Sequence, residues 1–153
     1  MLPSDPAKVR EALLRWTRGD EAAADFLHEM AQIARLADDI VDEDENRQRN
    51  VCWLLSRTLT ILPANPFFVR HASVLAPQIN SIIVQWQQSD EWRSSRDALK
   101  RTFGFVMREA IGSLVTAVAG IIGGYEHAKA TADDFFETCH SGQRETVEDW
   151  IKD

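Results

Sequence analysis

Apolar residues recur every three or four positions along most of the chain, which is the spacing of an amphipathic α-helix. The alternation of apolar and polar residues that predicts β-strands is almost absent. Glycines, prolines and short polar runs divide the pattern into segments. The predicted helices span residues 6–18, 21–42, 47–62, 67–88, 96–122 and 132–141. The chain is therefore predicted to be all-α, a single compact bundle of about six helices in one domain covering residues 1–153.

Two of these helices have apolar faces that we expect to point into the core, because their members lie three or four residues apart. The face of the first helix consists of Val9, Ala12, Leu13 and Trp16. The face of the third helix consists of Val51, Leu54, Leu55, Leu59 and Leu62.

Breaks between the helices are predicted from residues that disfavour or cap a helix. Pro77 predicts a kink or a restart inside the fourth helix. Gly123 and Gly124 predict the end of the fifth, and Thr131 is a candidate cap for the sixth. We expect Trp150 to dock the C-terminal tail.

Length and composition fit one soluble globular domain. The chain has 153 residues, of which 44% are hydrophobic and 27% charged, and its net charge is −7. An acidic balance argues against a general nucleic-acid binder, which needs a basic face for phosphates. We find no signal-peptide pattern and no apolar run of the roughly 20 residues that span a membrane, so we expect a cytoplasmic protein. Cys52 and Cys139 lack metal-ligand spacing and predict reduced thiols.

The stretch "ARLADDIVDEDE" carries the clearest candidate chemistry. Asp38, Asp39 and Asp42 form a DDxxD pattern at the C-terminal end of the second helix, where spacings of three and four place carboxylates on one face. Acids at a helix C-terminus are unfavourable unless something compensates them. Mg2+ is a natural compensator, because it binds one or two carboxylates together with substrate phosphates. The pattern predicts that these three aspartates bind Mg2+.

A polar track extends back from these aspartates along the same helix. His28, Gln32 and Arg35 continue the stripe of Asp39 and Asp42. Arg35 is a candidate for a phosphate, or alternatively an ion-pair partner of the neighbouring aspartates. Two readings of the acidic cluster without a metal stay open: a solvated end of a surface helix, and a patch that contacts a protein.

Four further residues are candidates for binding an anion. Arg70 and His71 lie at the start of the fourth helix, where backbone N–H groups favour anions. Arg101 and Arg108 are seven residues apart and share a face, from which a guanidinium could hold a phosphate. The alternative for each is a structural or solvent-exposed side chain.

The segment "ARLADDIVDE" resembles the first Asp-rich motif of class I isoprenoid synthases, especially the squalene and phytoene synthase branch. The resemblance implies an all-helical fold in which Asp38 and Asp42 are Mg2+ ligands, supported by Asp39, and the metal holds a diphosphate. That family uses a second acidic motif on a facing helix. The candidate segment here, "FVMREAIGSLVTA", offers Glu109 but no aspartate.

A second resemblance covers more of the chain. The order "ADDIVDED", "ILPANPFFVRH", "INSIIVQWQ" and "VMREAIGSLVTAVAGIIGG" is similar to small helical proteins of tailed bacteriophages. It implies a phage accessory protein acting in the host cytoplasm.

Together these features lead to one preferred hypothesis and two rivals. The preferred one is a phage-type accessory protein that binds a divalent cation and a phosphorylated small molecule, such as a nucleotide signal of host defence. The rivals are a metal-independent helical module that binds a host factor, and an enzyme like the class I isoprenoid synthases. No good nucleophile is evident, so any turnover would use metal-activated water on a phosphoanhydride. Enzymatic activity and self-association stay open.

Overall fold

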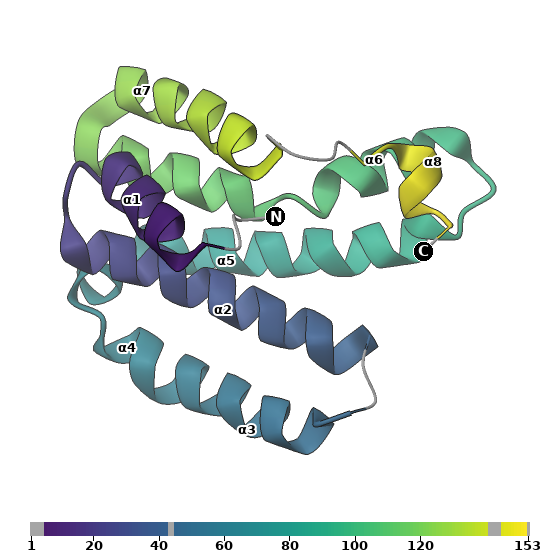
Figure 1. The fold of residues 1–153 in the computed structure, drawn as a ribbon, viewed down its shortest axis with the longest axis horizontal. Helices are drawn as coiled ribbons and strands as arrows, with labels where there is room; N and C mark the ends of the chain where they lie inside the picture. Colours follow the sequence, from purple (N-terminus) through teal and green to yellow (C-terminus); the bar gives the residue numbers. More distant parts are fainter. Residues whose placement is uncertain (1–4, 43–44, 141–144, 153) are drawn as a thin grey trace. The chain divides into compact units, whose positions relative to one another are not determined.

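The computed structural model describes residues 5–42, 45–140 and 145–152, and every regular element among them is a helix (Figure 1). The prediction of an all-α fold is confirmed. The chain forms two compact units: Arg10–Ala72, and Ser73–Asp153 together with the N-terminal residues as far as Val9. Each unit is considered by itself below.

The helices of the first unit follow closely on one another. They are the greater part of α1 (Pro6–Trp16), α2 (Glu21–Asp42), α3 (Arg47–Ser56), the π-helical η1 (Arg57–Ile61), α4 (Leu62–Ala64) and the start of α5 (Pro66–Arg93). As predicted, the apolar face of α1 is buried. Asp20 caps α2, accepting a hydrogen bond of 3.0 Å from the Ala23 backbone N–H.

The aromatic core of this unit joins α2 to the start of α5. The ring of Phe26 is fully buried, with its centroid 6.0 Å from that of Phe67 and 5.8 Å from that of Phe68. Asn65 fixes the turn before α5, because its side-chain amide donates to the Ala22 carbonyl and its side-chain oxygen accepts from the Phe68 N–H, both at 2.9 Å.

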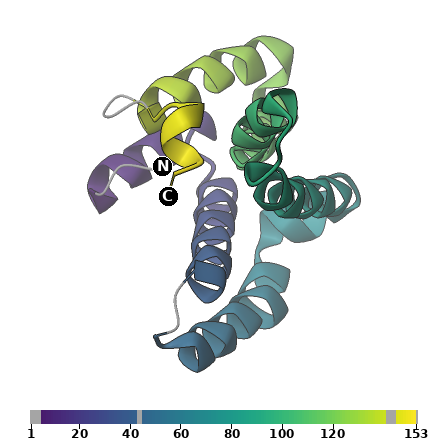
Figure 2. The ribbon, with the colours of Figure 1, turned by 90° about the vertical axis from the view of Figure 1, so that its right-hand side faces the viewer.

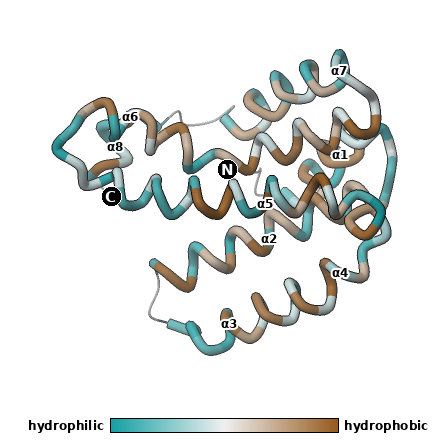
Figure 3. Tube along the Cα trace, turned by 180° about the vertical axis from the view of Figure 1, so that it is seen from behind, coloured by the Kyte–Doolittle hydropathy of each residue, from teal (hydrophilic) through white to brown (hydrophobic). Residues whose placement is uncertain are grey.

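Helices α2 and α3 form an antiparallel hairpin, visible in two views (Figures 1 and 2). The predicted inward face of α3 is wrong in part: Leu62 is buried, but Val51, Leu55 and Leu59 are 37%, 51% and 70% exposed. The polar Asn50 is buried instead, at 4%. Hydrophobic residues of α3 and η1 are therefore exposed, and the tube coloured by hydropathy shows how often such residues occur along this segment (Figure 3).

The second unit contains the rest of α5 with α6 (Ala98–Met107), α7 (Ile111–His140) and α8 (Val147–Trp150). Helix α7 turns back on itself (Figure 1) at Gly124, whose φ of 75° and ψ of −170° interrupt the helix as predicted. The chain resumes a helix directly after this glycine, so Thr131 is buried within the second half of α7 and does not cap it. Helix α5 continues through Pro77 without restarting.

The predicted helix over 96–122 is interrupted at residues 108–110, which separate α6 from α7. Tighter hydrogen bonds between residues three apart replace the helical ones there, as from the Ala110 N–H to the Met107 carbonyl at 3.1 Å. Trp150 docks the C-terminal segment as predicted: it is 6% exposed, and its ring centroid lies 5.8 Å from that of Phe105.

The close contact between Gly112 and Phe135 predicts a loss of stability when this glycine is replaced. A Cβ added at Gly112 would lie 2.7 Å from the Phe135 ring, so Gly112→Ala must displace that ring. We expect Gly112→Ala to lower the free energy of unfolding by about 1–3 kcal/mol, measured by urea denaturation.

Gly120→Ala is the matched control, because its added Cβ would meet Ala128 at an ordinary 3.6 Å. This variant should be neutral, or more stable by up to about 1 kcal/mol from helix propensity. Replacing Phe135 with Leu should reduce the cost of Gly112→Ala. An equal cost in both backgrounds would contradict the proposed clash.

Candidate functional site

The acidic end of α2 carries two aspartates, Asp39 and Asp42, that no described residue neutralises. Asp38 and Asp42 are exposed and Asp39 is half-buried, while Glu43 and Asp44 lie outside the described residues. Within the described part of the chain, Asp39 and Asp42 make no hydrogen bond or ion pair. The last turn of α2 contains no basic residue. The aspartates therefore add to the partial negative charge of the helix terminus.

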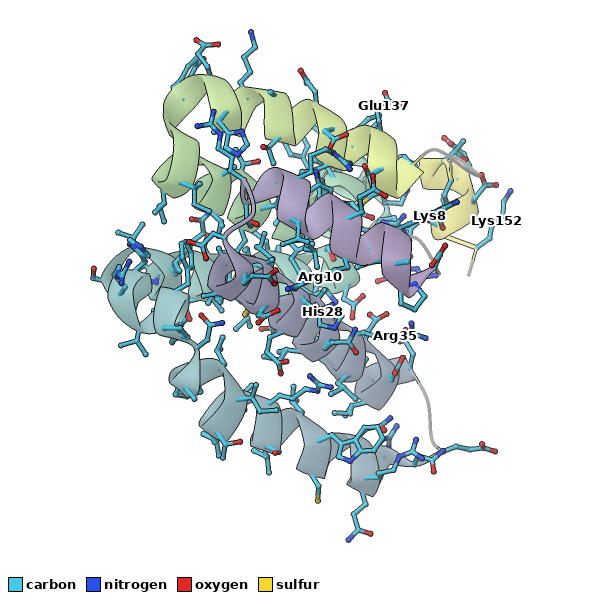
Figure 4. All side chains as sticks on the ribbon, turned by 60° about the vertical axis from the view of Figure 1, so that its left-hand side comes forward. Lys8, Arg10, His28, Arg35, Glu137 and Lys152 are labelled. Atoms are coloured by element: carbon cyan, nitrogen blue, oxygen red, sulfur yellow. The ribbon has the colours of Figure 1, made fainter. Side chains whose placement is uncertain are left out.

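The first half of the same polar side is neutralised. Arg10 of α1 forms ion pairs with Glu21 and with Asp25, the latter at 2.7 Å. Arg10, His28 and Arg35 project on one side of α1 and α2 (Figure 4). Arg35 is exposed and makes no ion pair within residues 5–42, 45–140 and 145–152.

The predicted metal ligands do not form a ready-made cage. Among the residues that the structure describes, no three His, Cys, Asp or Glu side chains are grouped so that they could hold a metal ion. What α2 does bring together is Arg35 with Asp39 and Asp42, on one side of the helix. Mg2+ binding at these carboxylates stays a prediction.

The other predicted anion ligands have different surroundings. Arg70 is exposed on α5, whereas the half-buried His71 packs its ring 4.7 Å from that of Phe67. In the second unit, Arg101 donates a hydrogen bond of 2.6 Å to the Ser95 carbonyl.

Arg108 is engaged on several sides. Its guanidinium lies 4.5 Å from the centroid of Phe105 and forms ion pairs with Glu145 and, at 3.8 Å, with Glu109. Its charge is thus already paired, which favours a structural role.

An ion pair that the sequence pattern did not predict fastens α3 and η1 to α2. A nitrogen of the Arg57 guanidinium lies 2.9 and 2.8 Å from the two carboxylate oxygens of Glu29, which is 8% exposed. Glu29 lies among the buried residues Phe26, Leu27 and Met30 of α2. A buried acid is almost always paired with a basic residue. The position of Glu29 on the apolar face of α2 was therefore the sequence signal from which an ion pair could have been predicted.

The contact line of the hairpin defines a second feature, here called the Trp53 face. Buried or paired residues mark this line at Glu29 and Leu36 on α2, and at Asn50, Leu54 and Leu62 on the opposing helix; Leu54 is half-buried. In each helix, the residue immediately before a contact-line residue points to one side of that line. Because the two helices are antiparallel, this is the same side of the hairpin for both helices. These residues are His28, Arg35, Arg49, Trp53 and Ile61.

The Trp53 face, completed by Asp39 and Asp42, combines exposed apolar groups with charges. Trp53 is 52% exposed and Ile61 48%. Arg49 lies over the Trp53 ring at 5.0 Å from its centroid and makes no ion pair within the described chain. The face is therefore an exposed surface with an aromatic centre and charges of both signs.

The cysteines give no sign of a reactive thiol. Neither Cys52 nor Cys139 forms a disulfide in the described chain, and burial raises the pKa of Cys139 to about 11, which keeps it protonated at neutral pH. The neighbouring His140 packs its ring 4.8 Å from that of Phe136.

In the described residues no single helix is both long and apolar enough to cross a membrane, and α6 with α7 meets that criterion only as a pair bent by 44°. No protein-family model, curated protein or solved structure matches the chain.

The ion pair between Glu29 and Arg57 predicts a stability difference between two acid substitutions on α2. Glu29→Gln leaves the Arg57 guanidinium partly buried without its counter-charge. We expect a loss of about 2 kcal/mol, below the ~3–5 kcal/mol for a fully buried pair because 29% of the Arg57 side chain is exposed.

The control is Asp25→Asn, which breaks an ion pair whose partners are 38% and 62% exposed. It should cost less than about 1 kcal/mol, because water screens such pairs. Urea denaturation followed by circular dichroism measures both variants. Equal losses would show that the Glu29 pair does not anchor the hairpin.

Proposed function

We propose that the chain is a helical protein-interaction module of the phage accessory type, which binds a protein partner through the Trp53 face and needs no metal. One observation carries the proposal: Trp53 stands half-exposed beside four charges that have no ion-pair partner in the described chain, and the half-exposed Ile61 extends the same face towards His28. These charges belong to Arg35, Asp39, Asp42 and Arg49.

The composition of this face is that of a binding surface. Tryptophan and arginine are enriched at the centres of protein interfaces, where a few such residues supply most of the binding free energy. Charges of both signs select a partner by complementarity. The phage resemblance supplies the setting, in which the partner is a protein of the bacterial host or of the phage itself.

The proposal predicts that Trp53→Glu removes binding without unfolding the chain. Trp53 is already half in water, so the substitution should change the free energy of unfolding by less than about 0.5 kcal/mol. We expect the amount of a specific partner recovered with the tagged chain from host cells, in EDTA, to fall about tenfold or more. Quantitative mass spectrometry of the recovered proteins measures this.

Tyr125→Glu is the matched control, because Tyr125 is 78% exposed and belongs to the second unit. This variant should recover the same proteins as the wild type. If Trp53→Glu recovers the same partners as the wild type, the proposal is wrong.

A second candidate function uses the same end of α2. Among the described residues Asp39 and Asp42 have no counter-charge, which favours a divalent cation, with Arg35 placed one turn from Asp39 for the phosphate of a small molecule. The isoprenoid-synthase alternative needs a second carboxylate cluster, and the described residues supply no metal-binding group that supports it.

Calorimetric titration tests this second candidate with Mg2+ alone and with Mg2+ plus a panel of nucleotides. Binding heat should be present in the wild type and absent in Asp39→Ala/Asp42→Ala. It should persist in Glu11→Ala, which removes an exposed acid of α1. If the double variant binds like the wild type, the cation site is not at these aspartates.

A further inference from the structure

The Trp53 face carries an aspartate on one helix and an arginine on the other, Asp39 and Arg49, which makes it complementary to a copy of itself. Arg35 and Asp39 lie on α2 with Asp42, and Arg49 lies on α3. We infer, building on the proposed function, that the protein bound by this face is a second copy of the same chain. The two copies are related by a twofold axis parallel to the hairpin.

The heights of the charged residues along the hairpin axis, here called their levels, support this arrangement. The Arg47 Nε–H donates to the Ile40 carbonyl at 3.1 Å, and Arg57 pairs with Glu29 further along the hairpin; these two contacts together place Arg47 near the level of Ile40. In an antiparallel pair, each step forward on α3 corresponds to one step back on α2. Arg49 is therefore within one residue of the level of Asp39.

The same count places Trp53 within one residue of the level of Arg35, and Ile61 within one turn of His28. Within one copy these groups are on neighbouring helices and point to the same side, so they do not face each other. A twofold axis parallel to the hairpin places α2 of one copy against α3 of the other at unchanged levels.

Across that axis Asp39 and Arg35 each meet a favourable partner. Asp39 faces Arg49 of the second copy, and the Arg35 guanidinium faces the ring of the second copy's Trp53, a cation–π contact. The acidic C-terminus of α2 also meets the N-terminus of the second copy's α3, so the helix dipoles attract. An axis perpendicular to the hairpin would instead bring the aspartates to the far end of the partner's hairpin.

Sedimentation velocity tests the inference directly on the wild-type chain. We expect a species of twice the 17.3 kDa chain mass, which dissociates more readily as salt is raised. Trp53→Glu should be a monomer with an unchanged far-ultraviolet circular dichroism spectrum. Leu59→Glu should stay a dimer, because Leu59 of η1 is 70% exposed on the side of the hairpin away from Trp53.

A charge exchange between copies tests the pairing itself. In the Asp39→Arg variant, positions 39 and 49 are both arginine, so like charges meet across the axis. In the Arg49→Asp variant both positions are aspartate, with the same result. Each variant alone should therefore dimerise about tenfold or more weakly than the wild type. An equimolar mixture should form a heterodimer at least as tight as the wild-type dimer, because both contacts are again between opposite charges.

The outcomes separate this inference from the proposed function. A wild type that stays monomeric, yet loses a host protein in Trp53→Glu, overturns the second-copy inference and leaves the proposed function standing. A dimer that survives Trp53→Glu but dissociates in Leu59→Glu overturns the interface. If host-protein recovery is also unchanged by Trp53→Glu, the proposed function fails as well. A mixture that forms no heterodimer overturns the charge pairing.

Discussion

The ion pair between Glu29 and Arg57 determines how the α2–α3 hairpin presents itself. The pair fixes the rotation of α3 about its axis, because Arg57 must face α2 to reach the buried carboxylate. Once that rotation is set, Asn50 is buried and Trp53 is directed to the flank of the hairpin. A buried ion pair adds little stability compared with apolar residues of similar volume, but removing one partner of the pair is costly. The pair therefore acts chiefly by fixing how α3 is oriented against α2.

The distribution of charge along the chain has a related consequence. Residues 46–72 contain four arginines and no acid, whereas the last turn of α2 and the connection after it are acidic. The hairpin thus places a basic helix start beside an acidic helix end. Within the described chain, Arg47 and Arg49 use their guanidinium groups on a carbonyl and on an aromatic ring, and Asp39 and Asp42 find no cation.

Sequence periodicity was sufficient for the helical class, for the buried face of α1 and for the break at Gly124. It failed where a tertiary contact overrode a local pattern. The stripe of Val51, Leu55 and Leu59 has helical spacing, and nothing local distinguishes it from a core face. Which face of α3 turns inward was decided by Arg57 and by a π-helical turn that starts there. Such a turn shifts the phase of the helix and has no reliable sequence signal.

The candidate site shows the same limit in another form. The spacing of Asp38, Asp39 and Asp42 predicted shared carboxylates on one helix face, and that much follows from helical geometry alone. It could not show that Arg108 is already paired, because Glu145 is 37 residues away in the sequence. Nor could it show that Trp53 shares a flank with the aspartates, since that depends on the contact line between two helices.

Mg2+ binding and protein binding by the aspartates cannot occur at the same time. A Mg2+ ion with its water shell and an arginine from a second chain would each occupy the carboxylate oxygens of Asp39. A Mg2+ ion adds two positive charges where a guanidinium adds one, and it brings no apolar surface to cover Trp53. The half-exposed Trp53 and Ile61 gain only when a protein surface covers them. A metal satisfies the charges of this face but leaves its apolar part in water, whereas a protein partner satisfies both.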